Sequence, residues 1–88
     1  MQRITDFDWS RREHVAKHNI EDYEVEYVIL FDRPFVRRGR DNTYYVFGVT
    51  EEGRYLFIVL AIKNGNLAKI ITARDMVKKE KQYYKERR

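Results

Sequence analysis

Cysteine is absent from the chain, and proline occurs only once, at Pro34. Without cysteine the protein forms no disulfides and no thiolate metal sites. The longest apolar run, Tyr55 to Ile62, is far shorter than the roughly 20 residues that span a bilayer. The N-terminus is polar from its second residue, unlike a signal peptide, and no glycine-, serine- or proline-rich linker interrupts the chain. We therefore expect one cytoplasmic domain over residues 1–88, without a membrane partner.

Charge is divided unevenly along the sequence. Residues 1–36 contain five Lys/Arg and eight Asp/Glu, a net charge of −3, whereas residues 37–88 contain thirteen and six, a net charge of +7. A basic half of this kind predicts a polyanionic partner such as nucleic acid. The alternative is a solvated, charge-rich surface, since 36% of the residues are charged. Composition alone leaves both interpretations open.

Two helices are predicted before the main sheet. Residues 4–8 alternate apolar and polar, which is typical of a short strand. Ser10 and Glu13 have the spacing of a capping box for a helix over 11–18, and Asn19 suits the left-handed position that ends it. Apolar residues then recur at three- and four-residue spacing, which predicts an amphipathic helix over 21–31. Its expected apolar side consists of Ile20, Tyr23, Tyr27, Leu30 and Phe31.

From residue 35 onward the apolar period changes to two. Strands are predicted over 35–40, 44–50, 55–62 and 67–74, and their short connections require antiparallel neighbours. The third of these is apolar on both faces and is expected at the centre of the sheet. Residues 75–88 predict a closing helix. The predicted fold is α+β, with two N-terminal helices, an antiparallel meander of three to four strands and a C-terminal helix.

Several short segments resemble one known family. They are Phe7-Asp8-Trp9 with Lys17-His18-Asn19-Ile20, then Gly53-Arg54, then Ile70-Ile71-Thr72-Ala73-Arg74, and finally Glu80 with Tyr84. Their order and spacing are similar to those of the BrnT-type ribonuclease toxins of type II toxin–antitoxin systems. Asn19 stands where that family usually has glycine, Thr72 where it has serine, and Val49 where it often has arginine.

The resemblance implies a RelE-like fold and metal-independent cleavage of RNA that inhibits translation, without a cofactor. It also implies a ribbon-helix-helix antitoxin of the BrnA type as partner, in an assembly that is either a homodimer or a toxin–antitoxin heterotetramer. In such cleavage the substrate's 2′-hydroxyl attacks the adjacent phosphate, and the protein supplies a base, a cation and a proton. The alternative is a binding module of the same fold without catalysis, and Val49 in place of a cation favours it.

Two arginines are the candidate cations for the transition state. The planar guanidinium of arginine matches two phosphate oxygens. Arg54 precedes the central strand and Arg74 ends the next one, so an antiparallel hairpin is expected to bring both to one end of the sheet. The alternative is that they are solvated or paired with Glu51, Glu52 or Asp75.

Three further residues are catalytic candidates. Glu80 and Tyr84 are four residues apart and share one helix face. Glu80 is predicted either to anchor Arg74 or to form an ordinary salt bridge. Tyr84 is predicted either to stack on a base of the RNA or donate a proton, or else to pack in the core. His18 is a candidate base because its unperturbed pKa is near neutrality, and its alternative role is a cap at a helix end.

Basic residues of three segments are predicted to contact the RNA backbone, which gives affinity without sequence preference. Tyr44 and Tyr45 lie among them and are candidates for base stacking, although tyrosines of a sheet more often pack. The antitoxin is an alternative occupant of the same surface. No metal site is predicted, since His14 and His18 lack a third ligand. The predicted backbone contacts are Lys17, Arg37, Arg38, Arg40, Lys78 and Lys79.

Overall fold

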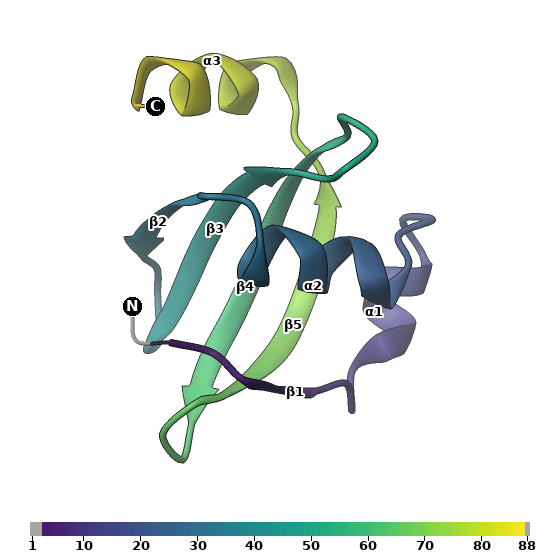
Figure 1. The fold of residues 1–88 in the computed structure, drawn as a ribbon, viewed down its shortest axis with the longest axis vertical. Coiled ribbons are helices and arrows are strands. Elements are labelled where there is room, and N and C mark those ends of the chain that lie inside the picture. Colours follow the sequence, from purple (N-terminus) through teal and green to yellow (C-terminus); the bar gives the residue numbers. More distant parts are fainter. Residues whose placement is uncertain (1–2, 88) are drawn as a thin grey trace.

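Five strands form one mixed sheet in the order β1-β5-β4-β3-β2 in the computed structural model, which describes residues 3–87 (Figure 1). Four of them run antiparallel to their neighbours in chain order. The first strand instead pairs parallel with the last, at the outer edge of the sheet. The strands are β1 (Asp6–Asp8), β2 (Phe35–Arg38), β3 (Thr43–Val49), β4 (Tyr55–Lys63) and β5 (Leu67–Asp75).

Three helices cover the two faces of this sheet. Helices α1 (Arg12–Ala16) and α2 (Asp22–Leu30) pack on one face, where their valines join the main core. Helix α3 (Lys78–Arg87) packs on the other face, at the end of the sheet drawn uppermost in Figure 1. None of the helices in residues 3–87 is long and apolar enough to cross a membrane.

The α+β class is confirmed, but two features of the predicted fold are wrong. The strand predicted over residues 4–8 is present as β1, so the chain does not begin with two helices. The sheet is not a pure antiparallel meander, because β1 pairs parallel with β5. The backbone N–H groups of Thr5 and Asp6 both donate to the carbonyl of Asn66 and extend this pairing. A three-residue strand carries too little pattern to indicate its partner, so the sequence did not reveal this edge.

The first helix is shorter than predicted and starts differently. Ser10 does not cap it: the Ser10 N–H donates to Asp8 Oδ1 at 2.8 Å, and no side chain caps α1. Asn19 does adopt the predicted left-handed conformation, with φ of 58°. A capping box is present at α2 instead. The Glu21 side chain accepts a hydrogen bond from the Glu24 N–H, and the Glu24 side chain accepts one from the Glu21 N–H.

The apolar side predicted for the second helix is mostly wrong. Ile20 is buried, but Tyr23, Leu30 and Phe31 face solvent. The residues of α2 that pack on the sheet are Val25 and Val28, together with the partly buried Ile29. The helix therefore has two apolar stripes, and the valines are small enough to bring its axis close to the strands.

Gly48 permits this close approach. A Cβ atom built on Gly48 would lie 2.5 Å from Val28 Cγ1 and 2.8 Å from Asp32 Oδ2. The same Asp32 oxygen accepts a hydrogen bond from the Val49 N–H at 3.0 Å. The end of α2 is thus fixed against β3, and this fixes α2 relative to the turn that joins β3 and β4.

Candidate nucleic-acid interface

The sheet separates the two arginines that were expected to converge. Leu56 pairs with Asp75, and Phe57 pairs with Arg74. Leu56 packs beneath α1 and α2, whereas Phe57 belongs to the cluster beneath α3. Because side chains alternate across a strand, Arg74 lies on the α3 face, and Arg54, two residues before Leu56, lies on the opposite face.

A β-bulge is the cause of this separation. Leu60 pairs with Ile70, but the preceding residue of β4, Val59, pairs with Thr72. Ile71 is therefore the extra residue of the bulge. A shift of one residue moves every following side chain to the other face. The bulge thus turns Arg74 away from Arg54 and toward α3.

Arg54 joins three elements on the face of α1 and α2. Its Nε and Nη2 donate to the two carboxylate oxygens of Asp75 at 2.6 and 3.0 Å. Nη1 donates to the carbonyl of Asn19 at 2.8 Å and to Glu24 Oε1 at 3.3 Å, and Nη2 donates to the carbonyl of His18 at 3.2 Å. A guanidinium has five N–H donors, so these acceptors, all within the described part of the chain, use every one. Arg54 is therefore paired with Asp75, as in the alternative interpretation of its role, and none of its N–H groups is left to bind a phosphate.

Arg74 is held differently and keeps donors available. Nη1 and Nη2 donate to the two oxygens of Glu80, each at 2.8 Å, and Nη1 also donates to the carbonyl of Asp75 at 3.1 Å. The guanidinium lies 4.6 Å above the ring centre of Phe57. Within residues 3–87, its Nε–H and one Nη2–H have no acceptor. Glu80 also accepts from the Val77 N–H at 2.9 Å, so the anchor of Arg74 is fixed to the start of α3.

A pocket of about 480 Å³ opens beside Arg74 on this face. The Arg37 guanidinium donates to the Tyr83 hydroxyl at 3.2 Å and lies 5.9 Å from the ring centre of Tyr45. Arg87 covers the Tyr83 ring at 3.7 Å. Aromatic rings for stacking with cations at the rim are the combination that binds single-stranded nucleic acid. The pocket is lined by Arg37, Tyr45, Phe47, Phe57, Lys79, Glu80 and Tyr83.

The remaining catalytic candidates lie away from this pocket. Tyr84 is buried, with its ring edge-on to Tyr55 at 5.9 Å, which fits the packing alternative. His18 is exposed beyond the end of α1, on the opposite side of the sheet from Arg74. The structure therefore brings Arg74 and Glu80 together but places neither Arg54 nor His18 with them.

The predicted backbone contacts are also divided between the two faces. Arg37 and Lys79 line the pocket, and Lys78 is exposed at the start of α3. Arg38 points to the opposite face, where it lies 5.3 Å from the ring centre of Tyr44. The other two predicted contacts, Arg40 in the β2–β3 turn and Lys17 after α1, are also exposed.

Tyr83 and Phe57 are pocket residues that the sequence did not indicate. Tyr83 and Tyr84 are adjacent, so they point in different directions: Tyr84 toward Tyr55 and Tyr83 toward Phe47. The alternating pattern of β4 is the signal that assigns Phe57 to the face opposite Leu56.

Acid should destabilise the protein through the two anchoring carboxylates. Hydrogen bonds from Arg54 lower the pKa of Asp75, and hydrogen bonds from Arg74 lower the pKa of Glu80. A carboxylate with a lowered folded-state pKa contributes stability above its unfolded pKa, near 4, and this stability is lost as pH falls through the folded pKa. The free energy of unfolding in urea should therefore decrease below about pH 4.

Asp75→Asn and Glu80→Gln should each flatten this pH dependence. Exposed Glu13 makes no side-chain hydrogen bond or ion pair within residues 3–87, and Glu13→Gln is the matched control that should keep the wild-type slope. Parallel slopes for all four proteins would contradict the assignment of the acid response to these two ion pairs.

The described residues contain no group of three or more His, Asp or Glu side chains arranged to hold a metal ion. The candidate interface instead consists of one positioned arginine, further cations and stacked rings on a single face. Comparison with known protein families, curated proteins and solved structures finds no match to this chain, so its function is inferred from this interface and from the resemblance of its sequence segments.

Proposed function

We propose that the protein is a metal-independent endoribonuclease toxin of the BrnT type, which acts in the cytoplasm and inhibits translation. The observation that carries the proposal is Arg74, held by Glu80 above Phe57 with two N–H donors free of acceptors within residues 3–87. Around it lie the rings and cations of the pocket. In this proposal a BrnA-type ribbon-helix-helix antitoxin inhibits the toxin, and the assembly is either a homodimer or a toxin–antitoxin heterotetramer.

Each part of the pocket has a role in this proposal. Arg37 and Lys79 bind the RNA backbone, and Tyr45 stacks on a base. Arg74 donates its remaining hydrogen bonds to the oxygens that gain charge when the 2′-hydroxyl attacks the phosphate. Glu80 is a positioning residue, because it fixes the orientation of Arg74 and is itself fixed by α3.

The second candidate is an RNA-binding module that does not cut. His18 lies on the other side of the sheet from Arg74, so the candidate base and the candidate cation do not converge. Val49 packs among the apolar residues of the α3 face, where the resembling family often has arginine. Both observations are the ones that support this second candidate.

Cleavage of a defined RNA in excess EDTA distinguishes the two candidates. The ribonuclease should yield fragments with 2′,3′-cyclic phosphate or 3′-phosphate ends and 5′-hydroxyls, because the nucleophile is the substrate's own hydroxyl. An RNA with a single 2′-deoxy sugar at the cut site should stay intact.

A binding module would retard the RNA in a gel without cutting it, and its affinity would fall steeply with salt. Cleavage that EDTA abolishes and Mg²⁺ restores, or cleavage of the 2′-deoxy substrate, would contradict the proposed mechanism.

A further inference from the structure

The second helix presents large apolar side chains to solvent. Tyr23 is 61% exposed, Leu30 44% and Phe31 71%. Val77 is the other exposed large apolar residue among residues 3–87, and it lies at α3. Scattered apolar side chains on a surface are ordinary, but a contiguous group marks an interaction site. We call the group formed by Tyr23, Tyr27, Leu30 and Phe31 the α2 patch.

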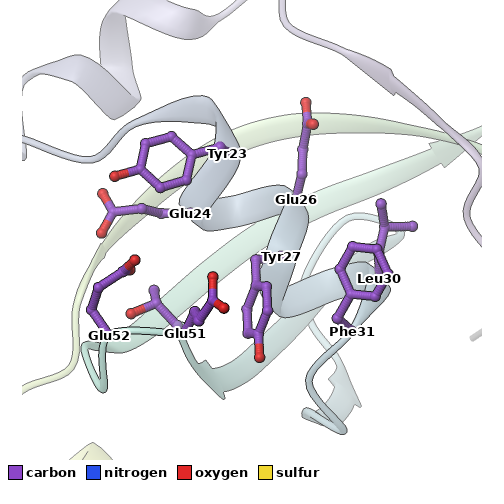
Figure 2. Close-up of a pocket in the computed structure, with 9 residues that line it drawn as sticks. Tyr23, Glu24, Glu26, Tyr27, Leu30, Phe31, Glu51 and Glu52 are labelled. Atoms are coloured by element: carbon purple, nitrogen blue, oxygen red, sulfur yellow. The ribbon is translucent and has the colours of Figure 1, made fainter.

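A hollow accompanies the α2 patch. It has a volume of about 260 Å³ and lies between α2 and the β3–β4 turn, as Figure 2 shows with Tyr27 and Phe31 on one side and Glu51 and Glu52 on the other. The Tyr27 and Phe31 rings contact each other at a centroid distance of 5.8 Å. A second cavity of about 610 Å³ shares Leu30 and Phe31 and is lined further on by residues of 3–5 and 34–36. Two adjoining hollows suit a peptide better than a small molecule.

The rim of the first hollow is acidic. Glu26, Glu51 and Glu52 line it, and in the described part of the chain no lysine or arginine forms an ion pair with any of them. The Glu26 carboxylate accepts a hydrogen bond from the neutral Trp9 indole at 2.8 Å, and Arg12 acts on it electrostatically without forming an ion pair. The negative field is felt by Tyr23, whose pKa is raised chiefly by the charge of Glu24 and then by Glu52.

A second copy of the chain is a poor occupant. A twofold contact through the α2 patch would bring Glu26, Glu51 and Glu52 of two copies together, and like charges at an interface oppose association. A contact with a different surface of the copy would need an exposed apolar anchor. Among residues 3–87 the α2 patch leaves only Val77 for that role.

We propose that the α2 patch docks a cationic peptide segment of a partner protein. An apolar side chain of the segment fills the hollow against Tyr27 and Phe31, and flanking lysines or arginines pair with Glu51, Glu52 and Glu26. Aromatic anchoring at the centre with charge pairing at the rim is how short segments gain both affinity and orientation. The patch and the RNA interface lie on opposite faces of the sheet, so this proposal stands independently of the ribonuclease.

A fluorescein-labelled helical peptide with one tryptophan and two leucines on one face and lysines elsewhere is a suitable probe. Its binding to the full chain is measured by fluorescence anisotropy and mapped by NMR chemical-shift changes. Two control peptides replace the apolar face with alanines or the lysines with glutamates. We expect binding of the probe that weakens with salt, shift changes at α2 and the β3–β4 turn, and no binding of either control.

Glu51→Lys combined with Glu52→Lys should weaken the probe about tenfold or more, because each reversal turns an attraction into a repulsion. Both residues are exposed in a turn, so the variant keeps its fold. The matched control, Glu13→Lys combined with Glu86→Lys, makes the same charge change elsewhere and should bind as the wild type does. Absence of binding, shifts confined to the α3 face, equal loss in both variants, or concentration-dependent dimerisation through α2 would overturn the proposal.

Discussion

Arg54→Ala is expected to lower the free energy of unfolding by about 2–4 kcal/mol, because the guanidinium bonds acceptors from three separate elements. Among them is the Glu24 carboxylate, whose side chain is only 10% exposed and loses its counter-charge. A domain of this size has a total stability of only roughly 5–10 kcal/mol, so the loss is a large fraction of it. Urea denaturation followed by circular dichroism measures the effect.

Two further variants show whether the geometry of Arg54 is responsible. Arg54→Lys should recover only part of the stability, because an ammonium group carries three donors at one point and cannot reach all the acceptors. Arg40→Ala removes an exposed cation and should change stability by less than about 0.5 kcal/mol. An Arg54→Ala protein as stable as the wild type but inactive on RNA would show that Arg54 binds the substrate directly.

Arg74→Ala should reduce the rate of RNA cleavage by about 10²–10³-fold, the usual cost of removing one group that stabilises transition-state charge. This expectation rests on the proposed ribonuclease activity. The Arg74 side chain is 34% exposed, and it makes three hydrogen bonds whereas Arg54 makes five. The free energy of unfolding should therefore fall less for Arg74→Ala than for Arg54→Ala. Single-turnover cleavage of an end-labelled RNA gives the rate, and a urea titration of the same sample shows that the variant is folded.

The matched control is Arg38→Ala, which removes the same charge from the opposite face of the sheet. It should leave the cleavage rate nearly unchanged and weaken RNA binding only slightly. Glu80→Gln keeps the shape of the side chain but weakens its hydrogen bonds to Arg74. Its cleavage rate should therefore lie between the rates of Arg38→Ala and Arg74→Ala. If Arg38→Ala and Arg74→Ala lower the rate equally, net charge and not position controls activity.

The sequence was sufficient for the strands β2 to β5 and for their turns. Alternation of apolar and polar residues located every end of these strands to within two residues. The β2–β3 turn shows why such turns are readable: Asp41 and Asn42 both adopt positive φ, which short polar side chains tolerate better than most. Both patterns depend only on residues close together in the sequence, so packing elsewhere in the fold does not change what they predict.

The pairing of β1, the orientation of α2 and the division of the site depend on long-range packing and were not predictable. The spacing of aromatic residues predicted that Tyr23 and Phe31 lie on the buried side of α2. In the structure Val25 and Val28 pack against the sheet instead. The site was divided by one bulge residue, Ile71, which leaves no composition signal yet reverses the face of Arg74. The alternation of side chains along a strand predicts which face a residue lies on only up to the next β-bulge.

The lengths of the two outer strands have a consequence for behaviour at high concentration. An edge strand offers unpaired backbone groups that can recruit other chains into intermolecular sheets. Here both edges are short: β1 has three residues and β2 has four, and β2 follows Pro34 and ends in Arg37 and Arg38. The long apolar strands are enclosed between them. Short and charged edges thereby protect a sheet rich in aromatic residues from edge-to-edge aggregation.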